Sequence, residues 1–145
     1  MLHLEIYNRT KTPVAARNFS ALLKPAWNIL RREKKLRRQK YTIELTFTGD
    51  SAIKKLNKYH HNKNRPTDVI SLSYYSLRMK DDFAGEIFIS VPYARRQARR
   101  VHQPLKEELR FLFIHGLLHV FGYDHVRARE EAHMKKLAYG ILGRN

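Results

Sequence analysis

An eleven-residue segment, His115 to His125, constrains this chain most strongly. His115 and His119 are four positions apart, so on a helix their side chains lie one turn apart on the same face and can bind one metal ion. Gly122 stands where a helix commonly ends in a left-handed residue, after which the chain can turn back and bring His125 to the same ion. Three histidine ligands and one open position are typical of a catalytic zinc site, and the chain has no cysteine to supply a thiolate. The segment therefore predicts one zinc ion per chain, bound by His115, His119 and His125.

The same spacing occurs in the extended zinc metallopeptidase pattern H-E-x-x-H-x-x-G-x-x-H, but Gly116 stands where that pattern has glutamate. The glutamate is the general base that takes a proton from the metal-bound water, so a metallopeptidase would lack its base here. Histidines packed inside a buried helix are the structural alternative. This alternative would explain a single histidine well. It explains poorly why three histidines occur at ligand spacing around a glycine.

The apolar periodicity predicts a single α+β domain over residues 1–145, with a four-stranded sheet and about five helices. Strands are indicated by alternation over residues 2–7 and 41–48, and by mostly apolar segments over residues 67–74 and 84–91. Helical spacing covers residues 14–36, and Pro25 should kink this segment or restart it as a second helix. Further helices are expected after Asp50, from Pro92, from Pro104 and over about 127–142.

Two segments between these elements carry separate expectations. Residues 59–66 are polar and show no periodicity, which predicts a loop. The helix that begins at Pro104 is apolar nearly all round from Leu109 to Phe121, which predicts that it is central and buried.

The charge balance is strongly basic, because 29 Lys and Arg stand against 13 Asp and Glu and leave a formal net charge of +16. Such a surface concentrates polyanions, and nucleic acid is the commonest polyanion in a cell. A membrane-surface or merely solubilising role is the alternative. The cationic run within residues 31–40 fits either a phosphate-binding patch or the solvated end of a helix.

A second cationic cluster lies in the helix expected from Pro92. Its four arginines form two like-charged pairs at i,i+4 spacing, which cost stability unless an anion neutralises them. An exposed helix face that tolerates the repulsion is the alternative to phosphate contact. These RNA-binding candidates are Arg95, Arg96, Arg99 and Arg100.

Several features argue against a membrane or secreted protein. The longest apolar run, residues 111–121, is interrupted by two histidines and is too short to cross a bilayer. No basic-then-apolar leader opens the chain, and residues 1–7 alternate as a strand does. The absence of cysteine excludes disulfides and is consistent with a cytoplasmic location.

The histidine segment closely resembles the H-G-x-L-H-x-x-G-Y-D-H signature of the YbeY family of metal-dependent endoribonucleases. The resemblance continues in three other places: Leu56-Asn57 followed by residues 66–71 (PTDVIS), residues 85–90 (GEIFIS) and the carboxyl-terminal helix around Glu130. It implies a small α+β domain with a zincin-like metallohydrolase arrangement. It also implies a cytoplasmic, zinc-containing, single-strand-specific endoribonuclease that matures ribosomal RNA, including the 3′ end of the small-subunit RNA, and serves ribosome quality control. The implied partners are single-stranded RNA, the rRNA precursor and the ribosome.

The resemblance also identifies candidate site residues and one departure. The family usually has an arginine where this chain has His61, followed two positions later by a lysine, here Lys63. A histidine lacks the planar fork that steadies a phosphate, although a protonated His61 or the nearby Arg65 could take over that role. Two further catalytic candidates come from their positions in the chain. Asp124 stands beside the third predicted ligand and either orients it or only caps a turn, and Asp68 either supports the site or only starts a strand.

A non-catalytic protein that uses zinc to fold and binds RNA or the ribosome is the main rival hypothesis. A structural zinc site is normally closed by a fourth protein ligand. His133 and His102 are available for that position, but neither has the right spacing. Chelation would then unfold the protein rather than only inactivate it.

Overall fold

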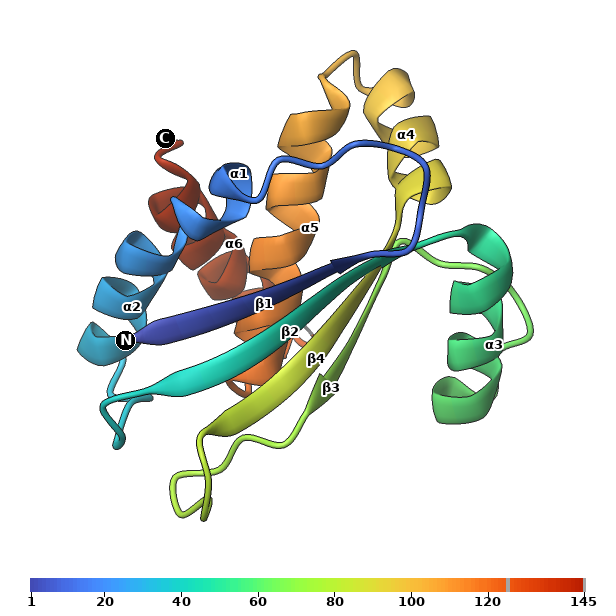
Figure 1. Ribbon diagram of the computed structural model, residues 1–145. Coiled ribbons are helices and arrows are strands. Elements are labelled where there is room, and N and C mark those ends of the chain that lie inside the picture. The colour runs from blue at the N-terminus through green and yellow to red at the C-terminus, as the bar shows by residue number, and fades with distance from the viewer. Residues whose placement is uncertain (125, 145) are drawn as a thin grey trace.

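One mixed four-stranded sheet organises the residues that the computed structural model describes, 1–124 and 126–144 (Figure 1). The strand order is β1-β2-β4-β3. Three strands run parallel: β1 (Leu2–Asn8), β2 (Tyr41–Thr48) and β4 (Phe83–Ser90). The edge strand β3 (Val69–Ser73) pairs antiparallel with β4.

Within the described residues six helices accompany the sheet. They are α1 (Arg17–Ser20), α2 (Leu23–Arg32), α3 (Asp50–His61), α4 (Val91–Arg100), α5 (Leu105–Val120) and α6 (Ala128–Leu142). Because α1 is a single turn, five longer helices remain, as the periodicity predicted. The predicted α+β class with a four-stranded sheet is confirmed.

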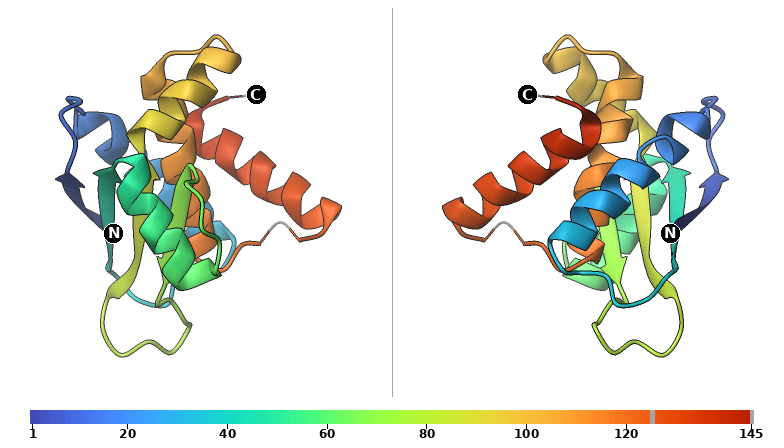
Figure 2. Two further views of the ribbon diagram at one scale, coloured as in Figure 1. Left: turned by 90° about the vertical axis from the view of Figure 1, so that its right-hand side faces the viewer. Right: turned by 90° about the vertical axis from the view of Figure 1, so that its left-hand side faces the viewer.

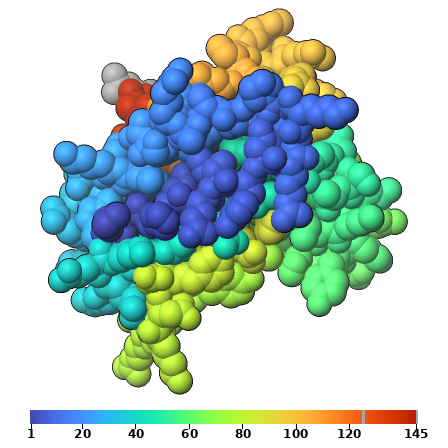
Figure 3. All heavy atoms as spheres, in the orientation of Figure 1, coloured from blue at the N-terminus to red at the C-terminus, as the bar shows by residue number. Residues whose placement is uncertain are grey.

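Helix α5 is the centre of the helical layer. It packs against β3 and β4 on one side and against α1, α4 and α6 on the others, on one face of the sheet (Figures 1 and 2). Nine of its residues are buried, as its apolar surface predicted. Among the described residues, no helix crosses the middle of the opposite face of the sheet, and the space-filling view of that side shows the strands at the surface (Figure 3).

Two glycines allow α5 to lie close to the sheet. A Cβ atom at Gly116 would stand 2.8 Å from Cγ2 of Ile87 on β4, which is closer than real side chains approach. At Gly85 on β4, a Cβ atom would stand 2.7 Å from both the Leu72 carbonyl oxygen and a methyl group of Val120. Gly116 therefore occupies a position where helix and sheet leave no room for a side chain. A glutamate, the base of the metallopeptidases, could not be accommodated there without separating the two layers.

The helical segment expected over residues 14–36 is divided. It breaks after Ser20 and restarts at Leu23, so that Pro25 lies in the first turn of α2, where its missing N–H costs no helical hydrogen bond. The predicted restart is therefore confirmed. The helix ends at Arg32 rather than at residue 36, because Lys34 adopts a left-handed conformation with φ 59°.

The loop expected over residues 59–66 begins later than predicted. Helix α3 continues through His61 and ends at Asn62, which has φ 56°. The N–H groups of Asn62 and Lys63 donate to the carbonyls of Lys58 and Asn57, a pattern that closes helix ends. The polar composition was misleading, because an exposed helical turn is as polar as a loop.

Within the stretches that the structure describes, no helix is both long enough and apolar enough to cross a membrane.

We expect Gly116→Ala to lower the free energy of unfolding by about 1–2 kcal/mol. The overpacking against Ile87 should cost about 1–3 kcal/mol, partly offset by the higher helix propensity of alanine. Urea unfolding followed by circular dichroism measures the difference. Gly140→Ala in α6 is the matched control, since its nearest neighbour is the flexible end of Ile29 at 3.2 Å. Equal effects of the two substitutions would show that the approach of α5 to the sheet is not the reason for Gly116.

Candidate metal centre

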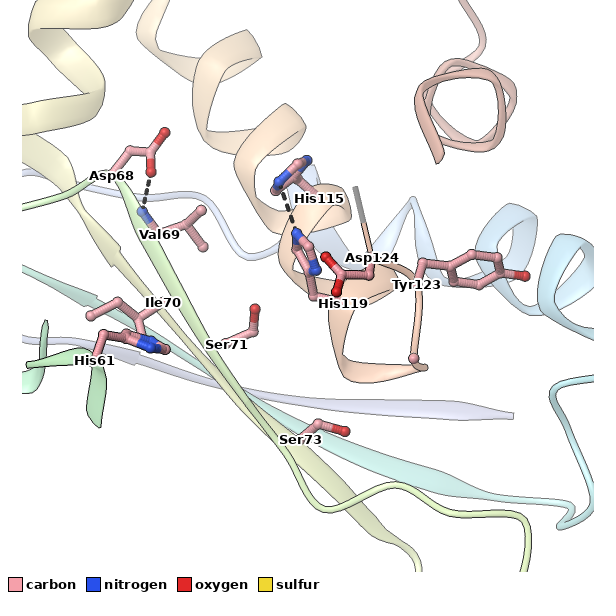
Figure 4. Close-up of a pocket in the computed structure, with 11 residues that line it drawn as sticks. His61, Asp68, Val69, Ile70, Ser71, Ser73, His115, His119, Tyr123 and Asp124 are labelled. Atoms are coloured by element: carbon pink, nitrogen blue, oxygen red, sulfur yellow. Dashed lines mark hydrogen bonds between the residues drawn. The ribbon is translucent and has the colours of Figure 1, made fainter. Parts of the chain in front are cut away.

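Helix α5 ends at the predicted glycine. Gly122 has φ 94°, a left-handed conformation that glycine adopts without strain. Its N–H donates to the carbonyl of His119, and the N–H of Tyr123 donates to the carbonyl of Leu118, both at 3.0 Å. These two bonds form a Schellman motif. The motif turns the chain so that Asp124 returns to the side of His119 (Figure 4).

His115 and His119 form a close pair on α5. Their Nε2 atoms are 3.1 Å apart, their ring centroids are 4.7 Å apart, and both side chains are half-buried. Two nitrogens bound to one tetrahedral zinc ion at 2.0–2.1 Å would be about 3.3 Å apart. The observed pair therefore fits a shared transition-metal ion to within a small adjustment of the rings.

The third predicted ligand, His125, lies outside the described residues. Among residues 1–124 and 126–144, no group of three or more His, Cys, Asp or Glu side chains is arranged to hold a metal ion. The three-histidine centre accordingly remains a prediction, of which the structure places two members.

The histidine pair faces a cavity of about 690 Å³ (Figure 4). All three catalytic candidates from the sequence line it, although each comes from a different part of the fold. His61 lies at the end of α3, Asp68 directly precedes β3, and Asp124 follows α5. The cavity is further lined by Val69, Ile70, Ser71, Ser73, Gly122 and Tyr123.

The Asp68 carboxylate is held by donors on three sides. One oxygen accepts from the Val69 N–H at 2.7 Å and from the Thr67 hydroxyl at 3.3 Å, and the other accepts from the Gln97 side chain at 3.3 Å. These bonds fix the carboxylate at the wall of the cavity. Across the cavity, the Asp124 carboxylate lies beside the His119 ring (Figure 4).

A polar network, not identified from the sequence, anchors the segment after α5. The Tyr123 hydroxyl donates to Glu33 at 3.2 Å, and Nε2 of His133 lies 2.7 Å from the same carboxylate. The ammonium group of Lys35 lies 4.8 Å from the centre of the Tyr123 ring. Burial, followed by the charge of Glu33, raises the pKa of Tyr123, so that the phenol stays protonated. His133, considered above as a fourth ligand, is thus bonded to a carboxylate.

Two of the cationic candidates form polar contacts within the protein. Arg96 forms an ion pair with Asp50 at 2.8 Å, and this guanidinium lowers the pKa of that carboxyl group. Arg95 donates to the Thr12 hydroxyl at 3.1 Å. Part of the like-charge repulsion predicted for α4 is therefore relieved inside the protein. The other candidates, all exposed as Arg96 is, are Arg99 and Arg100 on α4, and Lys63 and Arg65 on the segment between α3 and β3.

We expect Glu33→Gln to destabilise the metal-free protein in a pH-dependent way. Hydrogen bonding to His133, then to Tyr123, lowers the pKa of Glu33 against the opposing effect of burial. A carboxylate with a lowered pKa stabilises the fold above its unfolded pKa, about 4.3, and this contribution disappears as the pH falls through the folded value. The deficit of the variant should be about 1 kcal/mol at pH 6 and should shrink as the pH falls below about 4.3.

Urea unfolding in the presence of a chelator measures this difference at each pH. Glu130→Gln, which alters an exposed carboxylate in the first turn of α6, is the control for loss of a surface charge. A deficit that stays constant from pH 6 to pH 3 would contradict the role given to the ionised Glu33.

Comparison with known proteins gives one consistent result. The family model described as endoribonuclease YbeY matches residues 5–145. A relative described as endoribonuclease YbeY from Persephonella marina is 42% identical over 92 residues, covering 62% of this chain but only 60% of that protein. A relative with the same description from Acholeplasma laidlawii is 35% identical over 126 residues, covering 87% of this chain and 85% of the relative.

Among solved structures, the solution structure of TM1509 from Thermotoga maritima has a similar fold. The TM-score is 0.61 at 24% identity, over 99% of this chain and 90% of that one. This similarity supports the fold alone. The match over residues 5–145 confirms the family that the histidine segment predicted: the chain belongs to the YbeY family.

Proposed function

We propose that this protein is a metal-dependent endoribonuclease, with residues 1–145 forming one domain that cleaves single-stranded RNA. The observation that carries the proposal is the half-buried pair of imidazoles, 3.1 Å apart between their Nε2 atoms, at the wall of a cavity that two carboxylates share. The net charge of +16 supports a polyanionic substrate, whereas a peptide substrate would leave that charge unexplained. The relatives described as endoribonucleases support the same reaction.

The finer parts of the proposal follow the family. The substrate is a ribosomal RNA precursor, with processing at the 3′ end of the small-subunit RNA, and the setting is the ribosome in the cytoplasm. Zinc is the proposed ion, held by His115, His119 and His125. Histidine nitrogens are ligands that zinc prefers, and no thiolate competes in a chain without cysteine. When bound, zinc supplies a Lewis acid that offsets charge on a phosphoryl oxygen and lowers the pKa of water toward about 7.

The side chains around the cavity have distinct proposed roles. Asp124, beside His119, orients that ring. Asp68, fixed by its three donors, retains an acceptor position toward the cavity and orients a hydroxyl group there. His61 lies on the opposite wall and, when protonated, binds a phosphate oxygen in place of the arginine usual in the family. Lys63 and Arg65, both exposed on the following segment, add positive charge at the rim.

Metal binding can be tested without any assay of activity. We expect the wild-type protein to bind one zinc ion, as measured by competition with a chromophoric chelator. His115→Ala and His119→Ala should each weaken binding by more than the roughly 10- to 100-fold that outer-sphere groups contribute. Affinity should also fall below about pH 6.5, because only neutral imidazole binds the ion.

His3→Ala is the matched control, since His3 is an exposed histidine on β1. Unchanged zinc affinity in both α5 variants would rule out the proposed centre.

Cleavage of a single-stranded ribosomal RNA fragment by protein of known metal content tests the reaction itself. We expect cutting to follow bound zinc and to vanish in His119→Ala, because that substitution removes one histidine of the close pair that is proposed to bind the ion. Circular dichroism before and after chelation should show both proteins still folded. RNA binding without cutting, together with unfolding on chelation, would instead establish the zinc-stabilised, non-catalytic RNA-binding protein.

A further inference from the structure

We infer that the outer face of α3 is a separate binding surface for single-stranded RNA. It holds the strand beyond the cavity that His115 and His119 face, which is called the metal cleft below. This α3 surface consists of Lys54, Lys55, Lys58 and Tyr59. The inference takes its ligand from the proposed function, but it concerns residues that line no part of the cleft.

The α3 surface is continuous with the cleft. Lys54, Lys58 and His61 follow one another at four- and three-residue intervals, so they lie along one side of the helix. His61, at the end of this row, lines the metal cleft. A strand that leaves the cleft past His61 therefore meets the lysines next.

The lysines of the α3 surface have no carboxylate partner among the described residues. No ion pair in those residues involves Lys54, Lys55 or Lys58, and the Lys58 ammonium group donates only to the amide oxygen of Asn62, at 3.2 Å. The acidic residue of α3, Asp50, is bonded to Arg96 and to the Ser90 hydroxyl. Like charges at this spacing repel each other, and phosphate groups would relieve the repulsion.

Tyr59 supplies a platform for a base. It is 84% exposed, more than any other large apolar or aromatic side chain in the described residues. Its ring stands edge-on to that of His60, with centroids 4.8 Å apart. Exposed aromatic rings among cations stack on unpaired bases, and they do so with little regard to base identity. Beside the ring lies a hollow of about 510 Å³, lined by Ser51, Lys54, Lys55, Lys58, Tyr59 and Asn64.

The fold does not account for these side chains. Helix α3 lies at the end of the sheet, where it contacts β3, β4 and α4 (Figures 1 and 2). It is anchored through its buried residues Ile53 and Asn57, on the side opposite the exposed lysines. Solvent exposure alone would allow any polar residues on this side of the helix. It carries instead three lysines and the exposed ring of Tyr59. Phosphate and an unpaired base complement that combination, whereas duplex RNA would offer no free base face.

Binding of a twelve-nucleotide, 2′-O-methylated single strand tests the inference in the full-length protein, with chelator present to exclude cleavage. Combining Lys54→Gln, Lys55→Gln and Lys58→Gln should reduce the slope of log affinity against log salt by about 2, since each contact to a single strand contributes about 0.7. Tyr59→Ala should weaken binding about 5- to 150-fold, the range for loss of one stacked base.

Two matched controls separate the α3 surface from general charge and aromaticity. The triple variant Lys24→Gln, Lys106→Gln and Lys136→Gln makes the same change of charge on α2, α5 and α6, and Tyr7→Ala removes an exposed tyrosine from β1. Salt slopes that fall equally in the two triple variants would overturn the inference, as would equal affinity for a duplex of the same length. Polyglutamate that displaces the RNA at equal charge concentration would assign the surface to an acidic protein instead.

These measurements are independent of the nuclease reaction. If the protein cuts no RNA but the α3 variants still lose salt dependence and affinity, the α3 surface stands and the proposed function fails. If it cuts RNA and the α3 variants bind as the controls do, the proposed function stands and the α3 surface fails. Circular dichroism of each variant ensures that a loss of binding does not reflect a loss of fold.

Discussion

The close approach of α5 to β4 is the contact on which the rest of the structure depends. Gly116 on the helix and Gly85 on the strand leave no space for a side chain at the two points of contact. This close contact buries α5 against the sheet and fixes the position of the histidine pair relative to β3. It also explains why a chain with metallopeptidase spacing lacks the metallopeptidase base. The position that would carry a glutamate is occupied by the sheet.

Charge is unevenly distributed over this framework. On the open face of the sheet, Glu5 pairs in register with Glu44, and Glu44 with Glu86, so that three carboxylates lie in a row across β1, β2 and β4. Burial, followed by repulsion from Glu86 and Glu5, raises the pKa of Glu44. Arg9 and Lys55 line the hollow that contains Glu44 and Glu86, whereas the exposed Lys54, Lys58, Lys63 and Arg65 lie on α3 and on the segment that follows it. This distribution would orient an approaching polyanion away from the open face of the sheet and toward α3 and the cleft.

The segment after α5 is held from two directions. The Schellman motif at Gly122 turns it back along the helix, and the Tyr123–Glu33 bond ties it to the end of α2. His133 on α6 reaches the same carboxylate. The basic run over residues 31–40 therefore has a structural role as well as a charge, since Glu33 and Lys35 hold Tyr123 in place. The sequence pattern of that run indicates only a phosphate patch or a helix end, because nothing in it points to a partner ninety residues away.

The sequence by itself determined what depends on neighbours along the chain. Period-two and helical spacing predicted four strands and the buried α5, and the four-residue interval placed His115 and His119 together. Gly122 predicted the end of α5, because a left-handed turn favours glycine wherever it occurs. The tertiary structure decided what depends on distant contacts. It set the strand order, the meeting of His61, Asp68 and Asp124 at one cavity, and the pairing of Arg96 with Asp50. It also explains why residue 116 is a glycine. Sequence periodicity describes one element at a time, whereas the space between a helix and a sheet depends on both elements.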